Sequence, residues 1–526
     1  MRKRIIFLLT LGICLWIFYI KWLVPVVPTS WLLQKHEFPV YLLESPARTL
    51  DPARADDPSS ARVLANIYEG LVRLRTGTEV EPCLAVRWEA SPDGRQWTFY
   101  LRPDVIFHDG TPFNAEAVKI NVERMLQQQE RYTYAVFTYG MVQSVEVIDP
   151  LTVRFNLKYP YAPFLYNLAM PVAAPMVSPR ALQQYKEEFW KHPAGTGPFI
   201  IQQWKDGEVV LAANSNYWGV KPSIPGVIFR SVPDPAKRAE LLLAGKAQIS
   251  EGIPPQEVAN LKNRGFRVIE TPGLDISYLG FYIDKGLFRD AALRRAARQA
   301  CDPHELAEQL FPGRVLVARG PLPPGTLGYK QTPEPVSPDP GKARQELLAA
   351  GYTPGVQITL LAYNSTRPYN PAGGERLARA LAGQLEKAGF SCSVKVYPWD
   401  EFKKAIYRQE GDAFIYGWTS DNGDPDNFLF TLFSSTQISG GLNATHYHNL
   451  KVDTLLASAQ QTTDNTLRTR IYREVLKYLQ EDAPVVFLHH SLHTVAAAGN
   501  IQGLIIRPQG IPFLGNVQLK QNEKTN

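Results

Sequence analysis

The chain has 526 residues, of which 45% are hydrophobic and 20% are charged, and this composition excludes a disordered or fibrous protein. The length is too great for one compact core, so we expect two or three lobes. The net charge is only +6, from 56 basic and 50 acidic residues. Because the interior of the chain has no long basic run, the charge pattern argues against nucleic acid as a partner.

The N-terminus has the pattern of an export signal. Three basic residues at positions 2–4 precede an apolar run over 5–20, which resumes at 22–24 after Lys21. Residues 1–27 are therefore predicted to be a signal peptide or an uncleaved N-terminal membrane anchor, the alternative being a buried core helix. Since the basic residues stay in the cytoplasm, the remaining chain is expected in the periplasm or at the outer face of the plasma membrane.

Strand and helix patterns alternate along the rest of the chain. Alternating apolar residues predict strands at 97–101 and within 145–157. Apolar stripes at helical spacing and capping residues predict helices at 114–128, 236–245, 291–300 and 374–389. This interleaving indicates an α/β or mixed α+β fold. Residues 312–340 are rich in proline and are predicted to form a rigid surface loop.

Searches for catalytic and metal-binding motifs are negative. The sequence contains no GxSxG, HExxH or GxxxxGK[ST] motif, so we expect no catalytic residue. Four cysteines lie far apart without a CxxC pair, which excludes a zinc ribbon or a thioredoxin-type site. A disulfide among three of them stays open: Cys83, Cys301 and Cys392.

Two further patterns, an acidic segment and a group of histidines, contain potential metal ligands. Residues 421–426 are acidic, but a calcium loop needs Gly at its sixth position and Glu at its twelfth, where this chain has Asp426 and Leu432. Histidines cluster near the C-terminus without cysteine or acidic partners, and we expect them to be structural: His446, His448, His489, His490 and His493. The sequence therefore predicts no metal and no cofactor.

Several motifs in order resemble the large solute-binding proteins of peptide and nickel ABC importers, known as family 5. They are LAVRW at 84–88, SPDG at 91–94, WTFYLR at 97–102, FHDGTPF at 107–113, GTGPF at 195–199 and NYW at 216–218. A helix over 293–300 followed by Asp302-Pro303 adds a further match. The resemblance extends from about residue 39 to about residue 519.

The resemblance implies a two-lobed periplasmic-binding-protein fold of the large type, with a hinge and an extra subdomain in lobe one. Lobe one would comprise residues 39–271 and 494–526, and lobe two residues 272–491. The implied protein is a monomer without enzymatic activity, which captures a solute between its lobes and delivers it to the transmembrane permease subunits of an ABC importer.

Two stretches resemble the dipeptide-binding members of the family: RPYNP at 367–371 and GWTSDNGDPDNF at 417–428. By this resemblance, Arg367 holds the carboxylate of a short peptide and Asp421 holds its ammonium group. The resemblance also implies that backbone groups pair with an extended ligand, near Trp418 and Thr419 and near the segment Glu69, Gly70 and Leu71.

The chemistry of a dipeptide agrees with these roles. Its two charges lie roughly 6–7 Å apart when it is extended, and a dry cleft must neutralise both. A guanidinium binds a carboxylate through two parallel hydrogen bonds, which a lysine cannot do. We further expect the ligand to favour a closed form, on the argument that only closure brings both charged partners together. The alternatives are the same fold with a nickel chelate, haem or another peptide-like solute, and an exported peptidase.

Overall fold

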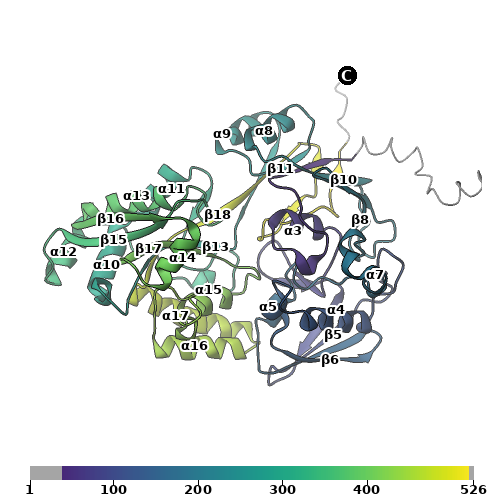
Figure 1. Cartoon of the computed structure of the whole chain (residues 1–526), viewed down its shortest axis with the longest axis horizontal. Helices are drawn as coiled ribbons and strands as arrows, with labels where there is room; N and C mark the ends of the chain where they lie inside the picture. The colour runs from purple at the N-terminus through teal and green to yellow at the C-terminus, as the bar shows by residue number, and fades with distance from the viewer. Residues whose placement is uncertain (1–37, 521–526) are drawn as a thin grey trace, which may run out of the picture.

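The computed structural model describes residues 38–520. The predicted signal peptide or anchor, residues 1–27, lies outside the described residues. Within residues 38–520, no helix has both the length and the apolar character needed to cross a membrane. The protein is a mixed α/β molecule with two lobes (Figure 1).

A twelve-stranded sheet extends through both lobes in the order β16-β15-β17-β13-β18-β11-β1-β10-β9-β8, and β12 and β14 pair with β18 beside this path. Its lobe-two strands are β13 (Asp275–Phe281), β14 (Val315–Val317), β15 (Val356–Tyr363), β16 (Phe390–Tyr397) and β17 (Ala413–Thr419). Its lobe-one strands are β1 (Val40–Leu43), β8 (Phe199–Lys205), β9 (Glu208–Ala213), β10 (Gly226–Ser231), β11 (Ile249–Glu251) and β12 (Arg267–Pro272).

The strand β18 (Val485–Ala497) joins the two halves of this sheet. Its first part pairs with β13 and β14, and its last part, from Leu492, pairs with β12 and β11. The second connection between the lobes passes from β12 to β13 at Gly273, whose N–H donates to the carbonyl of Ser491 over 2.8 Å. The predicted lobe boundaries, at residues 271–272 and 491–494, lie beside these two connections. The division into lobes at those residues stays a prediction.

Helices cover the lobe-two part of the sheet, shown in green in Figure 1. They are α10 (Ala291–Ala300), α11 (Pro303–Leu310), α12 (Pro340–Ala349), α13 (Gly374–Lys387), α14 (Trp399–Tyr407), α15 (Asp426–Phe433), α16 (Leu450–Gln461) and α17 (Asn465–Asp482). Side-chain caps begin several of them: Asp290 accepts from Ala292 N–H, and Asp464 from Thr466 N–H. Strand β13 is buried along its whole length between these layers.

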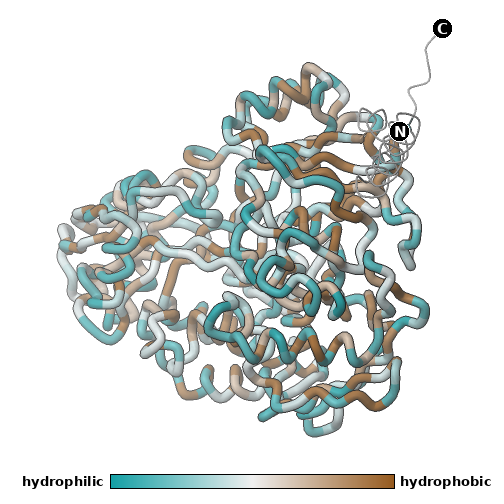
Figure 2. The backbone as a smooth tube through the Cα atoms, turned by 45° about the vertical axis from the view of Figure 1, so that its right-hand side comes forward, coloured by the Kyte–Doolittle hydropathy of each residue, from teal (hydrophilic) through white to brown (hydrophobic). Residues whose placement is uncertain are grey.

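Lobe one contains α3 (Pro58–Leu64), α7 (Pro179–Tyr185), α8 (Pro235–Leu243) and α9 (Pro255–Asn263). Short C-terminal strands follow β18: β19 (Ile501–Gln502), β20 (Ile505–Ile506), β21 (Pro512–Phe513) and β22 (Gln518–Leu519). Figure 2 shows stretches of hydrophobic residues inside the molecule and hydrophilic residues along the outer helices and loops.

The extra subdomain has a four-stranded antiparallel sheet, in the order β4-β5-β7-β6. Its elements are β2 (Val72–Leu74), β3 (Val80–Pro82), β4 (Ala85–Ala90), β5 (Gln96–Leu101), α4 (Ala115–Gln127), α5 (Ala135–Tyr139), β6 (Val142–Asp149), β7 (Thr152–Leu157) and α6 (Phe164–Asn167).

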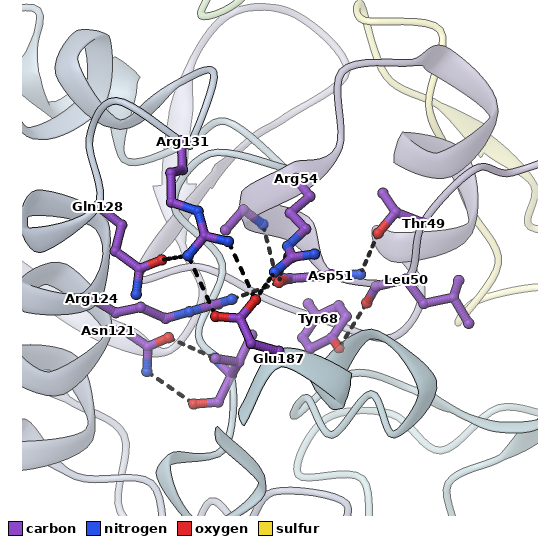
Figure 3. Close-up of polar contacts among 12 residues, drawn as sticks. Thr49, Leu50, Asp51, Arg54, Tyr68, Asn121, Arg124, Gln128, Arg131 and Glu187 are labelled. Carbon is purple, nitrogen blue, oxygen red and sulfur yellow. Dashed lines mark hydrogen bonds and ion pairs between the residues drawn. The ribbon is translucent and has the colours of Figure 1, made fainter. Parts of the chain in front are cut away.

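A polar network ties the subdomain helix α4 to the N-terminal part of lobe one (Figure 3). Arg124 of α4 donates to buried Asp51 over 2.5 Å, and Arg54 donates to Glu187 over 2.7 Å. Arg131 reaches the same glutamate at 3.4 Å. The shared carboxylates fix the orientation of the subdomain against lobe one.

The predicted strands and helices are confirmed within a few residues, and the helix 291–300 matches α10 at both ends. The prediction for the proline-rich segment is only partly correct. It runs over the surface in places, but residues 321–323 are buried, because the segment covers an apolar part of lobe two that includes Leu476 and Leu479. Cys83, Cys301 and Cys392 are free thiols.

Candidate ligand-binding cleft

A cavity of about 770 Å³ opens between the lobes. Lobe two and the crossing strands contribute the segments 274–275, 366–368, 419–421 and 491–495 together with Arg314 and Pro371. Lobe one and its subdomain contribute the segments 44–45, 55–59, 170–172, 251–253 and 508–511 together with Ala61, Arg62 and Tyr134. A volume of this size accommodates a ligand as large as a short peptide.

Arg367 and Asp421 reach this cavity from neighbouring strands. Arg367 lies in the loop after β15, and Asp421 lies two residues after the end of β17. Strands β15 and β17 pair in parallel through Leu360↔Ala413, so their carboxyl ends meet at one edge of the sheet. In open α/β sheets this edge is where ligands bind.

The Arg367 guanidinium is positioned by an aromatic ring. Its Cζ lies 3.4 Å from the centre of the Trp399 ring, at the start of α14. The backbone of Arg367 is fixed by reciprocal hydrogen bonds with Asn370. Its Nε is buried and makes no hydrogen bond within residues 38–520. The stacking orients the guanidinium and leaves its donors available for an anion.

Asp421 is a half-buried carboxylate with one contact from the other lobe. Its Oδ1 accepts a hydrogen bond from the Tyr134 hydroxyl over 3.3 Å. Burial raises the pKa of Asp421 to about 6, and the bond from Tyr134 acts in the opposite direction. Such a carboxylate is stabilised by a cation that enters the cavity.

The loop that carries Asp421 is fixed from beneath by an ion pair. Arg468 of α17 donates twice to Asp424, over 2.9 and 2.6 Å, and both side chains are almost completely buried. Asn422 donates to Asn167 of the subdomain over 2.7 Å. These contacts fix the part of the loop that directly follows Asp421.

Trp418 and Thr419 end β17, where they pair with Ile276 and Asp275. Thr419 lines the cavity. The Trp418 indole N–H is directed to Asn427 over 2.9 Å instead, so of this pair only Thr419 reaches the cleft lining.

The structure does not bring the segment Glu69, Gly70 and Leu71 to this cavity. The Glu69 carboxylate is buried and accepts hydrogen bonds from Thr196, Tyr217 and Trp218. Leu71 is in the subdomain core, and Gly70 forms a bridge with Pro175. The corresponding part of the cavity wall is formed by Met170, Pro171 and Val172, so the implied pairing of a ligand with this segment has no support in the cavity lining.

Lobe closure is not what brings the two charged partners together, contrary to the expectation from the sequence. Arg367 and Asp421 both follow strands of the same half-sheet, so their separation is set by one lobe. The group that comes from the opposite side is Tyr134. Neither Tyr134 nor Arg314 is predicted from the sequence, since neither lies in a recognisable motif.

Three of the five histidines near the C-terminus have structural partners. His489 and His490 each bond a backbone carbonyl, of Tyr369 at 3.0 Å and of Asp275 at 2.5 Å respectively. His446 pairs with Asp284. Among residues 38–520 no group of three or more potential metal ligands is present.

The chain belongs to the bacterial extracellular solute-binding proteins, family 5, whose middle region matches residues 79–440. It is 32% identical to a dipeptide-binding protein of Escherichia coli K12 over 478 residues, covering 86% of this chain and 89% of that protein.

Two solved structures extend the likeness to three dimensions. HbpA2 of Haemophilus parasuis is 31% identical and has a TM-score of 0.86, with 92% of this chain and 100% of that chain covered. A dipeptide-binding protein of Pseudoalteromonas sp. SM9913 in complex with Met-Leu is 26% identical and has a TM-score of 0.71, with coverages of 91% and 99%. The two-lobed fold expected from the sequence is therefore confirmed.

Proposed function

We propose that this protein captures dipeptides or other short peptides between its lobes and delivers them to the permease of an ABC importer. One observation carries the proposal. Within residues 38–520, the Arg367 guanidinium and the Asp421 carboxylate make no ion pair, and both open into the same cavity from adjacent parallel strands. The two ends of a zwitterion complement these two groups.

The relatives support the same class of ligand. The Escherichia coli relative is a dipeptide-binding protein, and the Pseudoalteromonas structure holds Met-Leu. The rest of the 770 Å³ cavity gives room for side chains and water. A site of this kind measures the distance between the two ends and accepts many side chains. Binding and release involve no bond cleavage.

Calorimetric titration with Ala-Ala tests the assignment. Arg367→Ala and Asp421→Ala are each expected to weaken binding at least 100-fold, because each leaves one ligand charge without a partner in the cleft. Matched controls are Arg379→Ala and Glu401→Ala, which remove exposed charges on α13 and α14 and are expected to bind like the parent protein. Unchanged affinity in both cleft variants would refute the assigned site.

The proposal also includes the location and the oligomeric state of the protein. We propose that the protein is exported, is held at the membrane through the N-terminal segment and acts as a monomer. Labelling of a C-terminal tag on intact cells would support the orientation, whereas labelling only after lysis would contradict it. A nickel chelate or haem as cargo would instead give the purified protein metal or colour, and its binding would be insensitive to loss of Asp421.

A further inference from the structure

Most carboxylates that line the cavity already have a partner within the protein. Four of its carboxylates have arginine partners: Asp56 and Asp57 pair with Arg48, Glu251 with Arg62, and Glu44 with Arg238. A fifth, Asp275, accepts two hydrogen bonds from Ser491 within the sheet. Of the carboxylates that line the cavity within residues 38–520, only Asp421 is left to receive a cation from a ligand.

Two guanidiniums of the lining have no carboxylate partner within residues 38–520. One is Arg367, described above, and the other is Arg314, which precedes β14. Burial lowers the pKa of His493, the remaining basic group of the lining, to about 4, so it is neutral near pH 7. The cavity therefore offers two cations and one open carboxylate, whereas a neutral dipeptide brings one charge of each sign.

The backbone of Arg314 is fixed although its side chain has no ion pair. Its N–H donates to Phe311 over 2.9 Å, and its carbonyl accepts from Leu492 of β18 over 2.8 Å. The pairing Val315↔Ser491 continues this ladder. Arg314 therefore lies beside the segment of β18 that crosses between the lobes, with a side chain free to meet a ligand.

The strand order places Asp421 between the two guanidiniums. Along the sheet, β15 is followed by β17, β13 and β18, and β14 pairs with β18. Arg367 follows β15, Asp421 follows β17, and Arg314 precedes β14. A peptide with its ammonium at Asp421 and its terminal carboxylate at Arg367 therefore has Arg314 beyond its ammonium end, on the side of its first residue.

We propose that Arg314 selects short peptides that carry a second carboxylate on the first residue. With a neutral peptide, lobe closure leaves the Arg314 guanidinium unpaired in a cleft that is losing water, which is unfavourable. An acidic first side chain supplies its partner. The inference rests on the proposed function and adds to it a preferred ligand class, peptides with net charge −1.

The test uses the full-length protein and pairs of peptides that differ by one charge but hardly in shape. Glu-Ala is expected to bind about tenfold more tightly than Gln-Ala, and Ala-Glu to bind within about threefold of Ala-Gln, in calorimetric titrations at pH 7.5. Arg314→Met is expected to abolish the first preference and to tighten Ala-Ala binding, because closure then leaves no guanidinium unpaired. Arg319→Ala, which removes a nearby guanidinium outside this cavity, is the matched control and should keep the preference.

The outcomes separate the two claims. If Ala-Ala binds but Glu-Ala has no advantage over Gln-Ala, this inference fails and the proposed function stands. The same holds if the advantage survives in Arg314→Met, or if the acidic residue is preferred at the second position. If no dipeptide binds at all, the proposed function fails and this inference with it. Because the comparison of peptides needs only the parent protein, it is decisive even if a variant folds poorly.

Discussion

Burial raises the pKa of the Asp421 carboxyl group to about 6. The ionised form is the one that accepts a peptide ammonium group. In the free protein it is therefore present above pH 6 and is lost as the pH falls through 6. A bound ammonium group stabilises the ionised form, so binding at pH 5–6 must release a proton.

We therefore expect peptide affinity to be nearly constant around pH 7 and to fall below pH 6, approaching tenfold per pH unit. Calorimetry across pH 5–8, repeated in buffers of different ionisation enthalpy, measures both the affinity and the released proton. Asp275 also has a pKa of about 6, but both its oxygens are occupied by Ser491, so a ligand should not change it. Constant affinity down to pH 5 would contradict the role of Asp421.

Some of the individual residues of the cleft were predictable from the sequence. Arg367 and Asp421 were identifiable because each lies in a family-like stretch, and both line the cavity. Arg314 and Tyr134 were not identifiable. Arg314 reaches the cavity only because β14 pairs with β18, nearly 180 residues further along the chain, and no local pattern encodes that pairing. Glu69 matched an expected segment, but the hydrogen-bonding groups that surround it are themselves distant in sequence.

At the scale of elements, the ion pair between α17 and the loop after β17 determines where Asp421 lies. Arg468 and Asp424 are 1% and 0% exposed, and Arg468 also donates to the Tyr472 hydroxyl over 2.7 Å. Removing one partner leaves the other as an uncompensated buried charge. The pair therefore couples the stability of α17 to the geometry of the cleft.

Arg468→Met is expected to lower the free energy of unfolding by about 3–5 kcal/mol and to weaken peptide binding, although Arg468 does not line the cavity. The double variant Arg468→Met/Asp424→Asn should recover part of the stability, since neither charge remains. Urea unfolding followed by circular dichroism measures both, with Arg379→Ala as a surface control that should change little. A loss in the single variant no larger than in that control would contradict a structural role for the pair.

Elements with strong local signals were predictable. Helix α13 ends before Gly389, which has a φ of 104°, as a glycine C-terminal cap requires. The sequence of the proline-rich segment does not show whether the segment is exposed or buried. Proline excludes helix and central strand, but it does not determine whether the segment packs against the protein, and here residues 321–323 are buried against lobe two.

For the whole molecule, the shared strand β18 determines how the two lobes respond to heat. Its first half completes the lobe-two sheet and its second half completes the lobe-one sheet. Apolar packing also extends from the subdomain into lobe two as one continuous cluster. Neither lobe can lose its sheet without removing pairing partners from the other.

We therefore expect a single cooperative transition in differential scanning calorimetry. A saturating dipeptide should move this transition upward as a whole, with a stabilisation of about 2.7 kcal/mol when the free peptide is at 100 times its Kd. The Arg367→Ala variant should show the same transition without the peptide-dependent shift. Two separate transitions, of which only one responds to peptide, would contradict the coupling.

The two-lobed architecture was predictable from length and from the family-like motifs, but the placement of both charged residues on one half-sheet was not. That placement depends on β15 and β17 being neighbours, a property of strand order rather than of spacing along the chain.

The place of β18 in the order of the chain has a consequence for biosynthesis. Residues 485–497 are made after all four strands with which they pair, β11, β12, β13 and β14. A nascent chain therefore cannot complete either half of the large sheet until β18 has been synthesised. Folding of both lobes is thereby delayed relative to the synthesis of most of their strands.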